Sequence, residues 1–230
     1  ACIAPDAHIA FIAIENKSST SMRGWMTTSV LKRAYGLETP TQARELYRDW
    51  ATTYDIHLQS GLHYRAPQRI AKILAEVLED RSRLILDVGC GTGLVAEYLA
   101  DHGFNACDGL DFSPEMLEVA EQKGIYQSLI EADLEKPLQI AEGSYDAAIC
   151  CGTFTHGHVG PQALGEICRV LKPGTPFACT IHNHLWEIAG FSLEIERLQA
   201  SGIATLESVR EESYFDGAPA DGKYCVLRRH

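Results

Sequence analysis

The sequence predicts an α/β fold whose mostly parallel sheet is covered by helices on both faces. The first observation is an alternation of short apolar runs with stretches in which apolar residues recur at helical spacing. Crossover helices between parallel strands produce that order. The second is the run 84–93, where apolar residues and Asp87 pass directly into alternating glycines and then a helical pattern. This pattern is typical of a buried strand turning tightly into a helix, where open α/β sheets bind nucleotide-like ligands.

Each expected element has a local signal. Pro67 stands in the first turn of an amphipathic helix, Ser113-Pro114 caps and starts another, and Lys172-Pro173-Gly174 stops a third. No helix separates the last two strands, so they should pair antiparallel as a hairpin. We expect helices up to Trp50 and over 67–80, 94–99, 113–120, 161–171 and 192–200, and strands at 84–88, 104–110, 129–132, 145–151, 177–181, 203–209 and 224–229.

Length and charge limit the class of protein. At 230 residues the chain suits one α/β domain with an N-terminal extension. The composition is ordinary for a globular protein, with 46% hydrophobic and 22% charged residues, which argues against disorder. A formal net charge of −11 argues against electrostatically driven nucleic-acid binding and suits a cationic ligand.

The cysteines and the N-terminus indicate a cytoplasmic protein. Although the chain has 8 cysteines, it has no C-x-x-C pair, and Cys150, Cys151 and Cys179 lie in apolar strand-like runs. Buried free thiols in a reducing compartment are therefore expected. Residues 1–14 lack a basic leader and a continuous apolar stretch, so we expect neither a signal peptide nor a membrane anchor.

The spacing of the glycines distinguishes among nucleotide-binding loops. A dinucleotide fingerprint needs its third glycine at position 94, which is Leu94, and no Gly-Lys-Ser/Thr follows as a P-loop requires. The remaining pattern, D-x-G-x-G-x-G, resembles that of the class I S-adenosylmethionine (SAM) methyltransferases. The resemblance implies a Rossmann-like sheet of seven strands with helices on both faces and SAM as the cofactor. It assigns to the cofactor site Asp87, Gly89, Cys90, Gly91 and Gly93.

Acids end three of the expected strands. Asp87, Asp111 and Asp133 should therefore face one ligand edge of the sheet. Asp111 stands 22 positions after Gly89, the spacing at which an acid reaches ribose hydroxyls in nucleotide-binding βαβ units. A carboxylate suits that role because it accepts hydrogen bonds from both hydroxyls. A single such Asp is usually only the cap of a turn or helix, but three in register behind a glycine loop favour a ligand site.

Two further strings resemble SAM motifs. The string 109–117 resembles the second motif, which assigns the ribose to Asp111 and the adenine contact to Phe112 and Met116. The string 131–134 resembles the third motif, in which Asp133, next to Leu134, accepts a hydrogen bond from the adenine amino group.

Three segments before the core, 47–51, 54–55 and 64–67, resemble the entry region of small-molecule methyltransferases. They are similar to the methyltransferase-like group named for the Williams–Beuren syndrome region and to the ubiquinone/menaquinone biosynthesis methyltransferases. The resemblance has Tyr54 closing over the donor and Arg65 pairing with its methionine carboxylate, whereas the alternative gives both residues ordinary packing and surface roles. It divides the chain into a flexible extension (1–25), a helical lid (26–66) and a SAM-binding domain (67–230).

The residues after the fourth strand bear on the chemistry. Methyl transfer from a sulfonium is an in-line displacement, to which a protein mainly contributes alignment of donor and acceptor. In the resemblance, the segment Cys151–His158 faces the transferable methyl, so Cys151 should contact SAM through its backbone. An acidic acceptor also needs a base; His156 or His158 could serve, and we predict His156. No Asn/Asp-Pro-Pro-Tyr string stands here, which argues against amino groups of nucleic acids or glutamine and favours a small-molecule acceptor.

Several alternatives remain open. The pairs His156/His158 and His182/His184 follow neighbouring strands and could converge on a metal ion, but no carboxylate or thiol spacing supports one, and we predict no metal site. The chain could also bind SAM without turnover, or use SAM for a different reaction. A nicotinamide oxidoreductase is disfavoured because its third glycine is missing.

Overall fold

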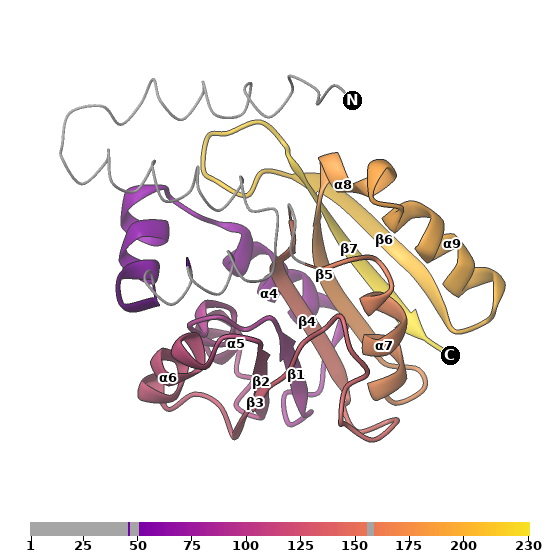
Figure 1. Ribbon diagram of the computed structural model, residues 1–230, viewed down its shortest axis with the longest axis horizontal. Helices are drawn as coiled ribbons and strands as arrows, with labels where there is room; N and C mark the ends of the chain where they lie inside the picture. Colours follow the sequence, from indigo (N-terminus) through magenta and orange to yellow (C-terminus); the bar gives the residue numbers. More distant parts are fainter. Residues whose placement is uncertain (1–45, 47–50, 156–158) are drawn as a thin grey trace.

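The computed structural model describes residues 46, 51–155 and 159–230, which build an open α/β sheet with helices on both faces (Figure 1). The sheet has seven strands in the order β3-β2-β1-β4-β5-β7-β6, which confirms the predicted number and class. The strands are β1 (Ile85–Val88), β2 (Cys107–Asp111), β3 (Ser128–Glu131), β4 (Ala147–Phe154), β5 (Pro176–His182), β6 (Ala204–Glu212) and β7 (Gly222–Arg229).

The pairing of the strands defines where a ligand can bind. Strands β1 to β5 run parallel, and β7 runs antiparallel to both β5 and β6, which confirms the predicted final hairpin. Strand β6 lies at the edge of the sheet, and β7 lies between β5 and β6. Strand patterns in the sequence do not predict this order. Strand order reverses between the neighbours β1 and β4. Ligands of open α/β sheets bind outside the carboxyl ends of the strands at such a reversal; we call this the carboxyl edge.

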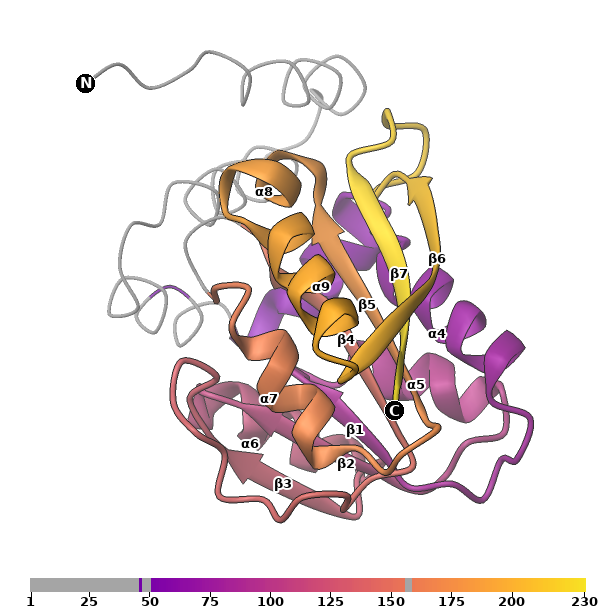
Figure 2. The same cartoon turned by 90° about the vertical axis from the view of Figure 1, so that its right-hand side faces the viewer.

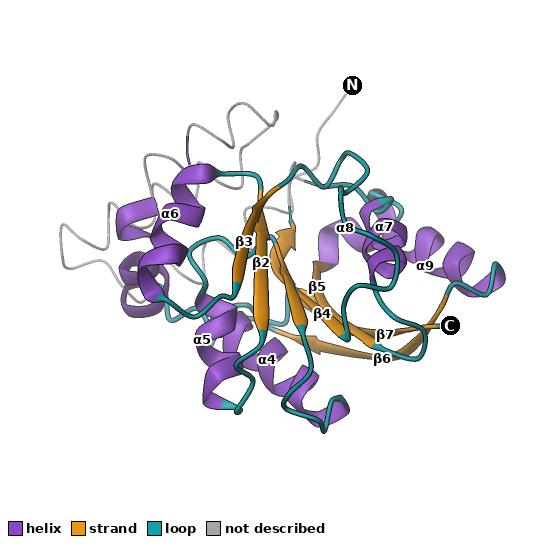
Figure 3. Cartoon of the chain, turned by 90° about the horizontal axis from the view of Figure 1, so that it is seen from below, coloured by secondary structure: helices purple, strands orange, loops and turns teal. Residues whose placement is uncertain are grey.

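Helices cover two separate apolar cores, one on each face of the sheet. They are α4 (Ala66–Val77), α5 (Leu94–Asp101), α6 (Pro114–Lys123), α7 (Ala163–Val170), α8 (Asn183–Ile188) and α9 (Phe191–Ala200). Alternate side chains of β1 enter different cores: Ile85 packs with α4 and α5, whereas Leu86 and Val88 pack with α7 and α9. Figures 2 and 3 show α7, α8 and α9 on one side of the sheet and α4 and α5 on the other, and α6 packs on β2 and β3.

The signals that predict α6 are confirmed. The Ser113 hydroxyl caps the helix by accepting a hydrogen bond from the Met116 N–H at 3.3 Å, and Pro114 stands in the first turn. The helix ends at Gly124, whose left-handed φ of 63° is easy for a residue without a Cβ. Local chemistry therefore fixes both ends of the helix that follows β2.

Two predictions about helices are wrong. The helix expected over 67–80 ends at Val77, because Leu78 takes an extended backbone conformation with φ −121° and ψ 97°. The guanidinium of Arg81 then donates to the carbonyls of Ala75 and Leu78 at this end. Helix α8 is missing from the prediction because it has only six residues, too few for apolar positions to repeat over successive turns. Its start is set instead by the His182 ring, which accepts a hydrogen bond from the His184 N–H at 3.2 Å.

The N-terminal predictions fall mainly outside the described residues. The helix expected to end at Trp50 and the extension 1–25 lie there, apart from Leu46, which is helical. Of the expected lid, the structure describes a 3₁₀ turn (Ala51–Thr53), a π-helix (Ile56–Gly61) and the approach to α4. Among the described residues, no helix is both long and apolar enough to cross a membrane.

Candidate functional site

The loop after β1 makes a close turn across the end of β2. The N–H groups of Gly89 and Cys90 both donate to the Leu110 carbonyl, at 2.7 and 3.0 Å. Gly89 has a left-handed φ of 67°, and a Cβ there would overlap the Thr153 hydroxyl from the end of β4. The loop can therefore run between β2 and β4 only with glycine at this position.

The loop opens at Gly91. This residue has a φ of 53°, and a Cβ added to it would meet no atom of the described residues within 4 Å. Its N–H donates to Asp111 Oδ2 at 2.8 Å. Gly93 starts α5 with a φ of 91°, and a Cβ there would lie 3.1 Å from the Tyr126 ring. Gly89 and Gly93 are thus required by packing, whereas Gly91 leaves the backbone open to an approaching ligand.

Asp111 ties the end of β2 to this loop. The residue is 7% exposed, and its two carboxylate oxygens accept from the N–H groups of Gly91, at 2.8 Å, and Ser113, at 3.0 Å. Burial raises the pKa of Asp111, and these backbone donors partly oppose the shift. Because each carboxylate oxygen has two acceptor positions, Asp111 can still accept hydrogen bonds from a ligand hydroxyl.

Asp87 is a fully buried carboxyl group next to Asp111. The Tyr126 hydroxyl donates to Asp87 Oδ2 at 2.7 Å, while Oδ1 has no hydrogen-bond partner among the described residues. Burial raises the pKa of Asp87 to about 7, opposed by the Tyr126 hydrogen bond and reinforced by the charge of Asp111. A buried, incompletely paired acid of this kind is stabilised in its ionised form by a nearby cation.

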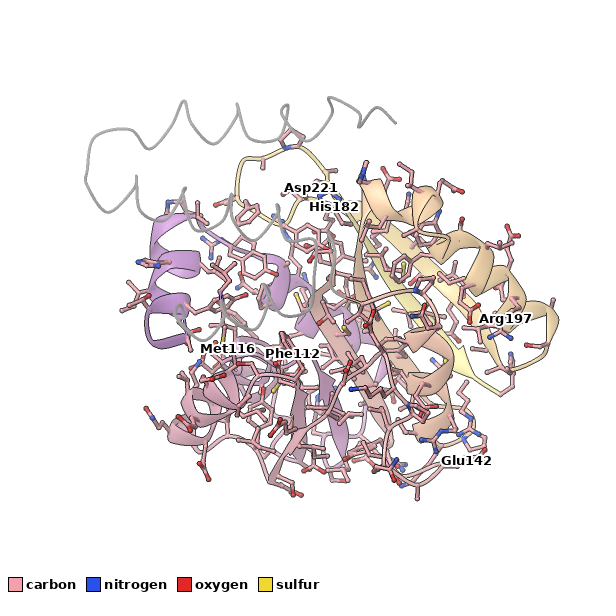
Figure 4. The ribbon with its side chains drawn as sticks, viewed as in Figure 1. Phe112, Met116, Glu142, His182, Arg197 and Asp221 are labelled. Carbon is pink, nitrogen blue, oxygen red and sulfur yellow. The ribbon has the colours of Figure 1, made fainter. Side chains whose placement is uncertain are left out.

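The residues assigned to the adenine lie around β2, α6 and the end of β3. Met116, on α6, is 2% exposed and Leu134 is 8% exposed, and Figure 4 labels Phe112 and Met116 close together in its view. Asp133 accepts from the Glu135 N–H at 3.0 Å and pairs with Lys136 at 3.0 Å. The carboxylate of Asp133 therefore stabilises the turn after β3. This is the capping role that the alternative to a ligand site gives to such an acid.

The end of β4 holds Cys151 and Gly152. The Cys151 sulfur lies 3.6 Å from the Tyr64 hydroxyl, and burial raises the pKa of Cys151 to about 12, so the group is a neutral thiol near pH 7. Gly152 has a φ of 76° and donates its N–H to the Thr180 hydroxyl at 3.0 Å. A Cβ on Gly152 would lie 2.9 Å from the Tyr64 hydroxyl, so Tyr64 lies directly against this backbone.

The segment 54–65, which we call the strap, connects this region with the start of α4. Tyr54 packs against the core of α4 and α5. Tyr64 stacks on Tyr214 with ring centroids 6.3 Å apart and forms a β-bridge with Phe215. Arg65, assigned to the donor's carboxylate, lies 3.7 Å from Asp216, and the side chains of this ion pair are 42% and 59% exposed. The strap thus contacts the connection between β6 and β7.

The four histidines of the possible metal site are only partly described. His156, the predicted base, and His158 lie outside the described residues. His182 stacks on Tyr214 at 6.0 Å, and Figure 4 shows it beside Asp221, which accepts from the Tyr214 N–H at 2.8 Å. Within the described part of the chain, no group of three or more His, Cys, Asp or Glu residues could hold a metal ion.

Sequence reasoning missed several residues that shape this edge. Tyr126 contacts both Asp87 and the position of Gly93, and Thr153 and Thr180 support the ends of β1 and β4. An aromatic residue two positions after the helix-ending Gly124 is a signal that could have drawn attention to Tyr126. The two threonines carry no such signal, because their role arises from pairing between β1, β4 and β5.

Comparisons with known proteins agree with this geometry. Residues 86–179 match the family model described as a methyltransferase domain. The chain is 36% identical over 179 residues to methyltransferase-like protein 27 of Homo sapiens, covering 75% of this chain and 72% of that protein. It is 31% identical over 118 residues to ubiquinone biosynthesis O-methyltransferase of Pectobacterium carotovorum, covering 49% of this chain and 48% of that enzyme. It is 38% identical over 73 residues to an 18S rRNA (guanine-N(7))-methyltransferase of Bos taurus, covering 32% of this chain and 26% of that enzyme.

Solved structures share the fold. The cyclase SpnF superposes with a TM-score of 0.64 at 20% identity, covering 84% of this chain and 96% of that one. A TehB-like SAM-dependent methyltransferase from Corynebacterium glutamicum gives a TM-score of 0.60 at 20% identity, covering 80% of this chain and 98% of that one. The glycine loop, the strand order and the relatives together define the class. The chain belongs to the class I SAM-dependent methyltransferases, whose methyl donor is SAM.

Proposed function

We propose that this protein transfers the methyl group of SAM to a small-molecule acceptor by in-line displacement. The observation that carries the proposal is the construction of the loop Gly89–Gly93, which is closely packed at both ends and open at Gly91, with the carboxylate of Asp111 beneath it. Gly91 lets the donor approach the backbone, and the neighbouring Asp87 offers a buried negative charge near pH 7 to a donor that carries positive charge.

In this proposal each donor group has its own partner. Asp111 accepts hydrogen bonds from the ribose hydroxyls, Phe112 and Met116 pack on the adenine, and Asp133, next to Leu134, accepts from the adenine amino group. Tyr54 covers the donor. Arg65 exchanges its exposed partner Asp216 for the donor's carboxylate, which is feasible because surface ion pairs contribute little stability. The remaining backbone contacts come from Cys90, Gly93 and Cys151.

The division of the chain follows from these roles. Residues 67–230 form the SAM-binding domain, and the described part of the expected lid, 51–66, lies over the donor; the expected extension 1–25 lies outside the described residues. The seven cysteines among the described residues are free, which supports a reducing, cytoplasmic location.

A small molecule is the acceptor that the relatives and the charge favour. The relatives that cover about half of this chain include enzymes of ubiquinone biosynthesis, whereas the match to the rRNA enzyme covers only 32% of the chain. A net charge of −11 is unfavourable for binding a polyanion such as rRNA. An acceptor hydroxyl would need a base, and His156, after β4, is the residue we assign to this role.

Release of S-adenosylhomocysteine from SAM, measured over a panel of phenols, acids, amines and thiols, tests the proposal. At least one acceptor should give turnover that SAM alone does not. With a hydroxyl acceptor, His156→Ala should lower the rate by about a hundredfold and remove the rise in rate through the histidine pH range, with SAM affinity unchanged. Tight SAM binding without turnover on any acceptor would favour a binding module, and an unchanged pH profile would exclude His156 as the base.

A further inference from the structure

Three separate segments of the chain meet at the carboxylate of Asp55. Asp55 Oδ1 accepts a hydrogen bond from the hydroxyl of Thr92, which belongs to the glycine loop. Asp55 Oδ2 lies 2.6 Å from the Nζ of Lys123, the last residue of α6. The strap, the donor loop and the helix that carries Met116 are therefore joined through one side chain.

This junction is more protected from solvent than a surface ion pair. The side chains of Lys123 and Asp55 are 17% and 27% exposed, and Thr92 is 1% exposed. Partial burial reduces screening by salt, so the contact is stronger than the same pair on an open surface. Lys123 also lies 3.1 Å from Glu97 of α5, whose side chain is 42% exposed and belongs to neither the strap nor the loop.

The backbone of the strap is unusual between its two ends. Its far end is fixed by the bridge of Tyr64 to Phe215. Between Asp55 and Tyr64 the chain forms the π-helix Ile56–Gly61, and His63 has a left-handed φ of 54°. Both features are uncommon, and such backbone persists only where the surroundings hold it. At the end next to the donor loop, the contacts of Asp55 with Thr92 and Lys123 keep the strap in this conformation.

We propose that Asp55 is a positioning residue for the donor. By joining the strap to Thr92 and Lys123, it holds the glycine loop in its position and slows the release of SAM and S-adenosylhomocysteine. This proposal rests on the assignment of the glycine loop to SAM. Gly91, the open position of the loop, is held on one side by Asp111 through its own N–H and on the other by Asp55 through Thr92. Loss of Asp55 leaves only the first of these restraints.

The test is the rate at which radiolabelled SAM leaves the protein after a chase with unlabelled SAM. Asp55→Ala should raise this rate about tenfold or more, because the charge-assisted contacts of Asp55 with Thr92 and with Lys123 are both lost. Asp55→Asn, which keeps an acceptor for Thr92 but loses the ion pair, should lie between this variant and wild type. Thr92→Val should raise the rate, and Thr92→Ser, which keeps the hydroxyl, should restore it.

Glu97→Gln is the matched control, because it removes the other partner of Lys123 without touching the strap. It should leave the release rate within about twofold of wild type. A purely structural role would lower the temperature of unfolding of the Asp55 and Thr92 variants but leave their release rates unchanged well below that temperature. That result, or equal effects of Glu97→Gln and Asp55→Asn, overturns the proposal.

Failure of this proposal can be told apart from failure of the donor site. If Asp111→Asn weakens SAM binding while Asp55→Ala and Thr92→Val release SAM at the wild-type rate, the donor site stands and the role of Asp55 is wrong. If Asp111→Asn has no effect on SAM binding, the assignment of the loop to SAM is itself wrong.

Discussion

The two halves of the carboxyl edge are built in different ways. In the donor half, comprising the glycine loop, the end of β2 and α6, partners are close in sequence: Gly91 and Asp111 are 20 positions apart, and Asp87 and Tyr126 are 39 apart. In the other half, comprising the strap, the end of β4 and the β6–β7 connection, partners are distant: Tyr64 and Cys151 are 87 positions apart, and Arg69 and Ser213 are 144 apart.

The two halves also use different chemistry. The donor half depends on backbone groups, positive φ angles and two buried carboxyls, all of which are specified by residue type at fixed spacing. The other half is an aromatic assembly in which Tyr64, Tyr214, Phe215 and His182 contact one another in pairs across the strap and the β6–β7 connection. We infer that the donor half tolerates little change, and that substitutions in the aromatic half affect the acceptor more than SAM.

At a fixed pH, the largest loss of stability that would test this contrast is expected at Gly89. A Cβ there would overlap Thr153 and force a residue with a side chain into a φ of 67°. Gly89→Ala should therefore lower the free energy of unfolding by about 3 kcal/mol or more, which combines strain and overpacking. Gly124→Ala has a similar φ of 63°, but its Cβ would meet no atom within 4 Å in the part of the chain that the structure describes, so it should cost only about 1–2 kcal/mol. The free energies of unfolding are measured with denaturant. If Gly89→Ala and Gly124→Ala lower this free energy equally, the glycine loop is not closely packed at Gly89.

The next effect is a pH dependence that arises from Asp87. Its pKa is raised from 3.8 to about 7 by burial, so the folded chain keeps a proton that the unfolded chain loses as pH rises from about 4 to about 7. The contribution of Asp87 to the free energy of unfolding should fall by about 1.4 kcal/mol per pH unit across that window and then level off. Asp87→Asn cannot titrate, so subtracting its free energy of unfolding from that of wild type isolates this slope. A difference that stays constant with pH would contradict the raised pKa.

The smallest effect is expected from Tyr64→Phe in the aromatic half. The change removes only the hydroxyl next to Cys151 and Gly152, so SAM affinity should stay within about twofold while the KM of the acceptor rises about threefold to tenfold. Tyr145→Phe is the control, because it removes a buried hydroxyl that donates to Asp108 at 3.0 Å, away from the strap. If Tyr64→Phe weakens SAM rather than the acceptor, the two halves are not separate.

The sequence predicts the donor half well because its signals are local. The acid, the alternating glycines, the capping Ser113 and the spacing to Asp111 each report a backbone requirement within a short stretch, and the structure confirms the loop, the strands and α6. The positions of Asp87 and Asp111 at neighbouring strand ends follow from the same pattern.

The aromatic half could not be predicted in the same way. Tyr64 reaches Phe215 only because β7 inserts between β5 and β6 and brings the β6–β7 connection to the carboxyl edge. The partner of Arg65, Asp216, comes from that connection, and no pattern around either residue indicates the pairing. Helix α8, with only six residues, is too short for its apolar residues to show a helical repeat.

The most direct test of the account is a calorimetric titration of SAM into wild type, Asp111→Asn and Asp101→Asn. Asp101 is an exposed carboxylate at the end of α5, so its variant controls for loss of charge alone. The account predicts that Asp111→Asn, verified as folded by its circular dichroism spectrum, binds SAM about ten- to a hundredfold more weakly, whereas Asp101→Asn binds like wild type. Equal affinities of wild type and folded Asp111→Asn would contradict the placement of the donor ribose at the end of β2, and with it the central claim.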